Sequence, residues 1–243
     1  MTHWHSYCDE TCISKPNDYM AIGGLFCPKS FAKSFAADIA SWRAKNGMSR
    51  ELKWTGIGES SLARYQDLGA QVVGHIRGGR LFFAAIILER KKLNHRLYNG
   101  GCDVVGQSKF LCQMGLHQFL PCMWYGDTMT IFPDQKRGKA YSSGYGELKG
   151  ALNSSILKKY HDYRVRVTDV CPICSKSSQL AQMNDILLGA VGCHANGRHL
   201  QGDGDSPKSR YSNWLARQLG FTSLADQTCC SEKQFQVWRF RLS

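Results

Sequence analysis

The run Leu81–Leu88 constrains the fold of this chain more than any other feature. Its residues, LFFAAIIL, are apolar at every position, with a glycine pair before them and Glu89-Arg90 after them. A strand that is apolar on both sides must be covered on both faces, as interior strands of layered α/β sheets are. The run is also much shorter than the roughly 18 apolar residues that a membrane helix requires. We therefore expect a buried strand of an α/β fold and no membrane segment.

Extended and helical segments alternate along the rest of the chain. The residue patterns predict further strands at 4–10, 19–27, 128–134, 163–169 and 235–242, and a short extended piece at 51–55. They predict helices at 29–45, 60–76, 107–120, 147–160 and 178–194. Such alternation is typical of three layers, in which helices flank a central mixed sheet on both faces.

The 243 residues fit one domain, because no internal repeat or linker divides them. Hydrophobic residues make up 43% of the chain and charged residues 21%, a balance that predicts a sizeable core rather than disorder. The stretch 196–213 is rich in Gly, Asp, Ser and Pro and is predicted to be a surface loop. We expect a single domain over 1–243, with a loop-rich C-terminal elaboration at about 196–230.

The formal net charge is +12. Basic residues recur at Arg77, Arg80, Arg90, Lys91, Lys92, Lys136, Arg137, Lys158, Lys159, Arg164, Arg166, Lys208 and Arg210. Such an excess favours a polyanionic partner, because neutralising phosphates releases counterions. The alternative is an ordinary solvated surface. Charge alone therefore favours nucleic acid as the binding partner only slightly.

The N-terminus, Met1-Thr2-His3-Trp4-His5, has neither the basic start nor the apolar stretch of a signal peptide. We expect a cytoplasmic protein. The chain has 11 cysteines, an odd number, and several lie in apolar segments. Both observations favour reduced thiols over paired disulfides.

Cys171-Pro172-Ile173-Cys174 has the spacing of half a zinc site or of a redox pair. A structural zinc site needs two more ligands, and no second C-x-x-C exists in the sequence. Distant residues that offer such ligands are Cys193, His194, His199, Cys229 and Cys230. Zinc binding stays an open and less favoured alternative.

Acidic residues close two of the predicted strands. Asp9 and Glu10 end the first strand, and Asp9 shares a face with His5 and Tyr7 because side chains alternate across a strand. Asp134 ends its strand directly after Pro133. Proline lacks an amide donor and so fits a strand end. Either acid also has a plain alternative role as a turn cap.

A third acid lies in the predicted helix 178–194. Its core face is formed by Leu180, Met183, Leu187 and Val191. Asp185 lies nearly opposite, on a narrow stripe with Gln182, Gly189 and Gly192. A charge there needs a cation, a metal or water, and an arginine partner is the plain alternative. The two glycines would allow another part of the chain to come close.

Four short motifs occur in a fixed order. They are D-E-T after the first strand, E-L-K-W at 51–54, a strand that ends in Asp, and S-x-x-Q-L-A-x-x-x-D-x-x-x-G-A in the later helix. Together with an apolar second strand that ends in Pro, this order resembles the domain-of-unknown-function 3800 family over about positions 5 to 195. The resemblance implies a ribonuclease H-like fold.

The resemblance implies that Asp9 is the first-strand acid, that Glu51 and Lys53 are the E-x-K pair, that Asp134 is the later-strand acid and that Asp185 is the helix acid. The sequence departs from the family pattern twice. Cys12 replaces the glycine of D-E-S-G, and Gln182-Met183-Asn184 separate Ala181 from the helix acid. Gln182 or Asn184 is therefore an alternative occupant of the position given to Asp185.

These acids predict a site for Mg²⁺ or Mn²⁺, since hard cations take carboxylate oxygens. Two such ions activate a water and stabilise the leaving oxygen in phosphoryl transfer. We therefore expect a metal-dependent nuclease acting on DNA or RNA, in which Lys53 steadies the phosphate or is merely a surface lysine. Trp54 is a candidate base-stacking platform, whereas the other tryptophans are expected in the core.

Two other interpretations of function remain. One is a binding module that grips nucleic acid or a protein without cutting, which the altered helix motif favours. The other follows from the family resemblance, which also implies a subunit working beside a protein partner in defence against mobile elements.

Overall fold

The computed structural model describes residues 1–93, 103–135, 139–161 and 165–241. Its centre is a six-stranded mixed sheet with the strand order β5-β4-β1-β2-β3-β6. The strands are β1 (His3–Thr11), β2 (Tyr19–Pro28), β3 (Phe82–Glu89), β4 (Asp127–Pro133), β5 (Val165–Val170) and β6 (Phe235–Phe240). β1, β2 and β3 pair antiparallel, whereas β4 is parallel to β1, β5 to β4 and β6 to β3.

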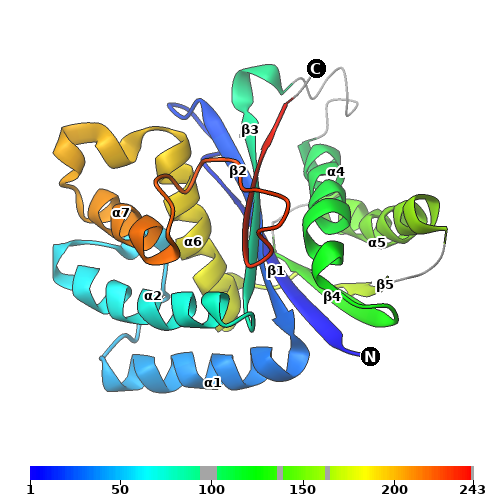
Figure 1. The fold of residues 1–243 in the computed structure, drawn as a ribbon, viewed down its shortest axis with the longest axis horizontal. Coiled ribbons are helices and arrows are strands. Elements are labelled where there is room, and N and C mark those ends of the chain that lie inside the picture. Colours follow the sequence, from blue (N-terminus) through cyan, green and yellow to red (C-terminus); the bar gives the residue numbers. More distant parts are fainter. Residues whose placement is uncertain (94–102, 136–138, 162–164, 242–243) are drawn as a thin grey trace.

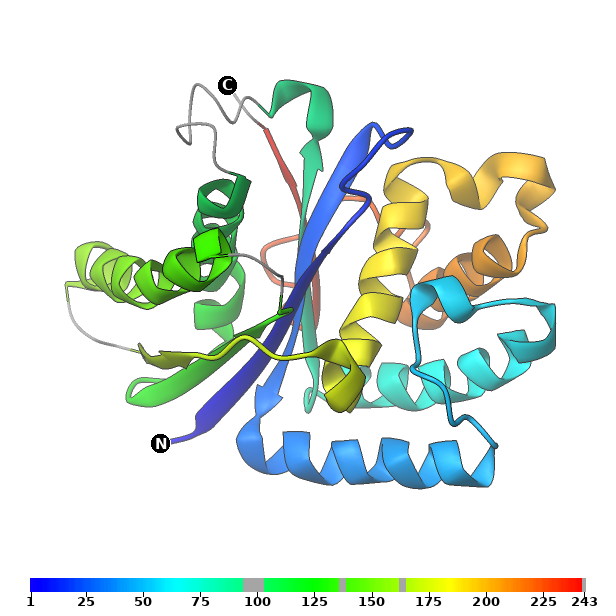
Figure 2. The same cartoon turned by 180° about the vertical axis from the view of Figure 1, so that it is seen from behind.

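Helices cover both faces of the sheet, as the alternating pattern predicted (Figures 1 and 2). One face carries α1 (Lys29–Lys45), α2 (Leu62–Arg77), α6 (Gln179–Ala195) and α7 (Pro207–Leu219). The other face carries α4 (Asp103–Met114) and α5 (Lys139–Tyr160). The protein is therefore α/β, with one hydrophobic core on each side of the sheet.

Strand β3 confirms the prediction made from the apolar run. Phe83, Ala85 and Ile87 belong to the core under α6, and Ala84, Ile86 and Leu88 belong to the core under α4 and α5. Side chains of a strand alternate between faces, so a strand that contributes to two cores must be apolar throughout. No helix in the described parts of the chain has the length and apolarity needed to cross a bilayer.

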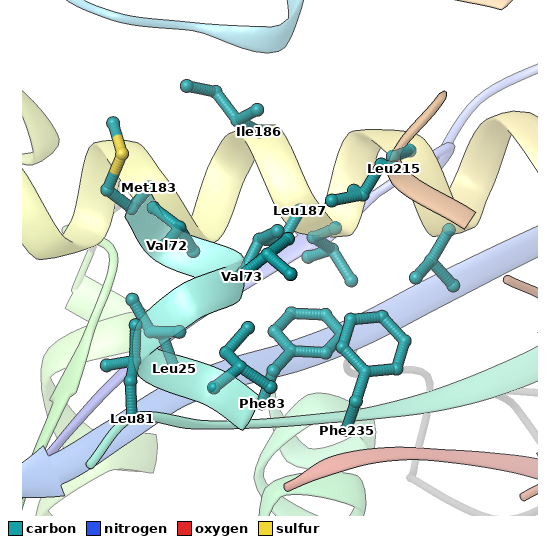
Figure 3. Packing of buried hydrophobic residues seen from close by; sticks show 14 of the residues in the cluster. Leu25, Val72, Val73, Leu81, Phe83, Met183, Ile186, Leu187, Leu215 and Phe235 are labelled. Carbon is teal, nitrogen blue, oxygen red and sulfur yellow. The ribbon is translucent and has the colours of Figure 1, made fainter. Parts of the chain in front are cut away.

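Helix α6 lies across β1 and β2 and forms the centre of the larger core. The four residues predicted as its core face, Leu180, Met183, Leu187 and Val191, are all buried. Figure 3 shows Met183 and Leu187 packed with side chains of α2 and β3. α1 and α7 cover further sides of the helix, and its buried residues include the polar Gln182 and Asn184.

The loop predicted for 196–213 is wrong in its second half, where α7 begins at Pro207. Ser206 is the N-cap, with its hydroxyl accepting from the amide of Ser209 at 3.1 Å, and proline is well suited to the first helical position. Gly220 ends the helix with φ +83°. Ser-Pro and Gly therefore mark helix ends here, and Arg198–Gly204 forms a 3-10 helix before them.

Other boundaries also differ from the predictions. Trp54–Gly56 is a 3-10 helix, so the extended piece predicted at 51–55 was wrong for Trp54 and Thr55. Glu51 to Lys53 belong to no regular element, although the backbone of Lys53 is extended. α5 begins at Lys139 rather than at 147, and α4 begins at Asp103 and continues into a π-helical turn, Gly115–Phe119. Positions 163 and 164 of the predicted fifth strand, like Lys136 and Arg137, lie outside the described residues.

Candidate functional site

The parallel strands β1 and β4 bring Asp9 and Asp134 to the same edge of the sheet. Cys8 lies opposite Pro133, and the amide of Asp134 donates to the Cys8 carbonyl at 2.9 Å. Tyr7 and Phe132, which precede the two acids by two residues, stack on each other on the α6 side, with ring centroids 5.2 Å apart. Alternation along each strand therefore places both acids on that face.

The 48–54 segment, which links α1 to the first 3-10 helix, brings Glu51 and Lys53 to the same place. Leu52 between them is fully buried. The Lys53 Nζ lies 3.2 Å from Oε2 of Glu51, and the Ser175 hydroxyl donates to Oε1 of Glu51 at 2.8 Å. Glu51 thus joins the lysine to the turn before α6.

Asp185 faces the same segment from α6. Its Oδ2 accepts from the backbone amide of Trp54 at 2.6 Å. The Trp54 ring lies against the helix at Gly189, where an added Cβ would come within 2.2 Å of the indole Cγ. Gly192, a turn further, lies against Thr11 and Cys12 at the end of β1. The two glycines do allow close approach, as predicted.

Electrostatics link the acids to Lys53. Burial raises the pKa of Asp185, and the nearby Glu51 raises it further, against the lowering effects of the Trp54 amide and Lys53. Burial likewise raises the pKa of Asp134, with repulsion from Asp185 adding to the rise. Backbone amides of Ser175 and Gln135, together with Lys53, oppose that rise. Two carboxyl groups are therefore held where a second negative charge is unfavourable.

Lys53 is the cation that these carboxyl groups share. Burial disfavours its ammonium form, but the hydrogen bond and attraction of Glu51, with attraction from Asp185 and Asp134, outweigh burial and raise the pKa of Lys53. Lys53 therefore lies within electrostatic reach of three acids, while 44% of its side-chain surface is exposed. The structure thus joins four of the five predicted residues, and Asp9 lies on the strand next to Asp134.

The donor set suits a hard divalent ion, since it consists of carboxylates whose charges repel one another. In the described ranges, however, no three His, Cys, Asp or Glu side chains are arranged to enclose a metal ion. The same holds for the C-x-x-C pair, and all ten described cysteines are free thiols. In this structure Lys53 supplies the positive charge among the carboxylates.

Gln182 does not replace the helix acid but supports the site from below. Its Oε1 accepts from the Leu52 amide at 3.0 Å and from Arg43 at 3.2 Å. Its Nε2 donates to the carbonyls of Ser175 and Lys176. One buried amide therefore fixes both the segment that carries Glu51 and the turn that carries its hydrogen-bond partner Ser175. Asn184, the other alternative, donates to the Gly23 carbonyl in β2 at 3.4 Å.

Arg43, near the end of α1, was not among the residues predicted from the sequence. Its guanidinium donates to the carbonyls of Met48, Ser49 and Arg50. It also donates to the side chains of Gln179 and Gln182. Arg43 therefore holds the start of the 48–54 segment against α6. A basic residue in a last helical turn is common and gives no sequence signal of this role.

The tryptophans differ from the prediction at two positions. Trp54 packs against Gly189 and lies edge-on to Tyr211, so its ring fills a structural role that a free stacking platform would not. Trp124, expected in the core, is 79% exposed, and its neighbour Tyr125 is 72% exposed. An exposed aromatic pair is the kind of feature that binds a partner.

A comparison of the chain with models of known protein families and with curated proteins found no match.

Proposed function

We propose that the protein is a metal-dependent nuclease that hydrolyses phosphodiester bonds of DNA or RNA on a ribonuclease H-like domain. A mixed sheet covered by helices on both faces is in keeping with that fold class. The observation that carries the proposal is the meeting of Asp134, Asp185 and the Glu51–Lys53 pair, from three separate parts of the chain. Repelling carboxyl groups beside a lysine suit a reaction that handles phosphate and a cation.

Asp9, Asp134 and Asp185 would hold the ion, with Glu51 as a further oxygen donor. When bound, Mg²⁺ or Mn²⁺ polarises the phosphoryl group and lowers the pKa of a bound water. The chain itself positions the substrate. The Lys53 ammonium binds a non-bridging phosphate oxygen, and the Glu51 carboxylate orients that ammonium through the 3.2 Å ion pair. Ser175 holds Glu51 in turn.

Cleavage of labelled DNA and RNA, with Mg²⁺ or Mn²⁺ present, tests the proposal. We expect Asp9→Asn and Asp134→Asn each to lower the rate by at least about a hundredfold, since removing one electrostatic group from an active site typically has that effect. Asp169→Asn is the matched control, because Asp169 is an exposed acid near the end of the neighbouring strand β5. Equal rates in all four proteins would remove the proposed roles.

A second candidate is a binding subunit that grips nucleic acid, or a protein partner in a defence complex, without cutting. The ion pair of Lys53 with Glu51 favours it, because a lysine already balances part of the negative charge. Salt-dependent binding to DNA or RNA with no turnover at any divalent metal concentration would support this candidate over the nuclease.

A further inference from the structure

A groove runs along β1 on the face that carries Asp9. It has a volume of about 850 Å³ and lies between β1, the start of α1 and the turn before α6. Figure 2 shows the N-terminal end of β1 beside these two segments. His3, His5 and Tyr7 line the groove, and Asp9 is the next residue on their side of the strand. Tyr7 is the last residue of β1 that lines the groove, and Asp9 follows two positions later on the same side of the strand.

The floor of the groove is aromatic. His5 lies 4.9 Å from Phe132 between ring centroids, and Phe132 stacks on Tyr7. His3 is fixed by the hydroxyls of Thr128 and Thr130, at 2.7 and 3.1 Å. Burial, with smaller effects of His3 and Lys29, lowers the pKa of His5 to about 4, so its ring is neutral at pH 7. Neutral, half-buried rings offer stacking surfaces rather than charge.

The wall of the groove is basic. Lys29 and Lys33 are exposed and lie four residues apart, on one side of α1. Opposite them, Ser177 and the N-cap residue Ser178 contribute hydroxyls and the positive end of the α6 dipole. No acidic residue lines this groove in the described part of the chain. An aromatic floor beside a basic wall is the combination that binds single strands.

The exposed pair Trp124-Tyr125 lies near the N-terminal end of the groove but does not line it. It belongs to the turn before β4, and a Cβ on Gly126 in this turn would come within 3.3 Å of Met1, which lines the groove. Asp127 fixes the turn, because its carboxylate accepts from the amides of Thr2 and Trp124 and from the Trp4 indole. The exposed rings are thus presented on a rigid support.

We propose that this groove is the path along which a single-stranded nucleic acid reaches the carboxylates. Lys29 and Lys33 bind its phosphates, and Trp124 stacks on a base near the N-terminal end of the groove. The inference rests on the proposed function, because the path ends at the proposed site of cleavage. A single strand is favoured over a duplex, since paired bases are stacked on one another and are not free to stack on an aromatic floor.

Fluorescence anisotropy of the full chain with a fluorescein-labelled 12-nucleotide single strand, as DNA and as RNA, tests this path without turnover when EDTA is present. We expect Lys29→Ala/Lys33→Ala to weaken binding about tenfold, and to flatten the slope of log Kd against log salt by about 1.4, at about 0.7 for each phosphate that is no longer neutralised. Lys149→Ala/Lys158→Ala, which removes the same charge from exposed positions of α5 on the other face, should change Kd less than about twofold.

Trp124→Ala should weaken binding by about five- to twentyfold, because one base can no longer stack on the indole. Its side chain is exposed, so the variant is expected to fold as the parent does. The path is wrong if both double variants lose affinity equally, if Trp124→Ala binds as the parent does, or if a duplex of the same length competes as well as the single strand.

The nuclease proposal is tested separately by Asp134→Asn, which should keep the affinity in EDTA. Loss of cleavage in Asp134→Asn with parental binding by the groove variants would overturn the path alone. Loss of binding in the groove variants with no cleavage by any protein would overturn the nuclease alone.

Discussion

Asp134 and Asp185 carry charge where their surroundings make charge unfavourable. Burial raises the pKa of both carboxyl groups, and each also lies near another acid. A carboxyl group with a raised pKa holds its proton more tightly in the folded protein than in the unfolded chain. The folded protein therefore loses stability as pH rises through the carboxyl range. Such groups reduce the stability of the folded protein at pH values above the carboxyl range.

We expect Asp134→Asn to increase the free energy of unfolding by about 0.5 to 1 kcal/mol at pH 7, the usual gain when an unfavourable charge is removed. The difference should shrink on acidification and vanish below about pH 3, where Asp134 is protonated in both the folded and the unfolded parent. Urea unfolding at several pH values measures it. If the variant is less stable than the parent at pH 7, the charge on Asp134 does not destabilise the folded protein.

Residues 48–53 have no regular structure of their own and depend on α6 and α1 for their place. Gln182 and Arg43 supply the hydrogen bonds that strand or helix partners supply elsewhere. We expect Gln182→Leu to lower the free energy of unfolding by about 2 to 3 kcal/mol, because the Leu52 amide and two carbonyls would be left unpaired. Gln179→Leu, which removes only one partner of Arg43, should cost less than about 1 kcal/mol in the same urea titration.

Close packing between α6 and Trp54 leads to a second prediction for this element. Gly189→Ala should destabilise the protein by about 1 to 3 kcal/mol, because the added methyl group overlaps the indole and must displace it. Gly150→Ala in α5 is the control, since open space surrounds that position and alanine favours helices by up to about 1 kcal/mol. Thermal unfolding followed by circular dichroism compares the two. Equal unfolding midpoints of the Gly189→Ala and Gly150→Ala variants would contradict the close contact between Gly189 and Trp54.

Local patterns were sufficient to predict most elements, whereas the choice of Glu51 and Lys53 depended on the family resemblance and the roles of all five candidate residues stay a prediction. The apolar run predicted β3, and the rhythm of Leu180, Met183 and Leu187 predicted α6. α7 was missed because Ser206 and Pro207 were counted as loop composition rather than as a helix start. The supports of the site were out of reach, because Arg43 and Gln182 are 139 residues apart in sequence and meet only in the folded chain. The residues next to Arg43 or Gln182 in the sequence do not predict this contact.

For the whole molecule, binding of a cation should increase the free energy of unfolding. A ligand that binds only the folded state stabilises it by about 1.4 kcal/mol at ten times its Kd. For a domain of this size, that gain raises the unfolding midpoint by roughly 3 to 6 °C. We expect Mn²⁺ to produce such a shift in the parent and not in a variant with both Asp9→Asn and Asp134→Asn. An equal shift in both proteins would place the ion elsewhere.

The pleat of strand β1 determines which of its side chains point to the α6 side. Tyr7 and Asp9 share that side only because an even number of positions separates them. One inserted residue between them would turn the carboxylate towards the α4 side, while leaving the composition and the apolar character of the strand almost unchanged. Natural variants that conserve both the groove and the acid must therefore keep an even sequence separation between Tyr7 and Asp9, whatever residue stands at position 8.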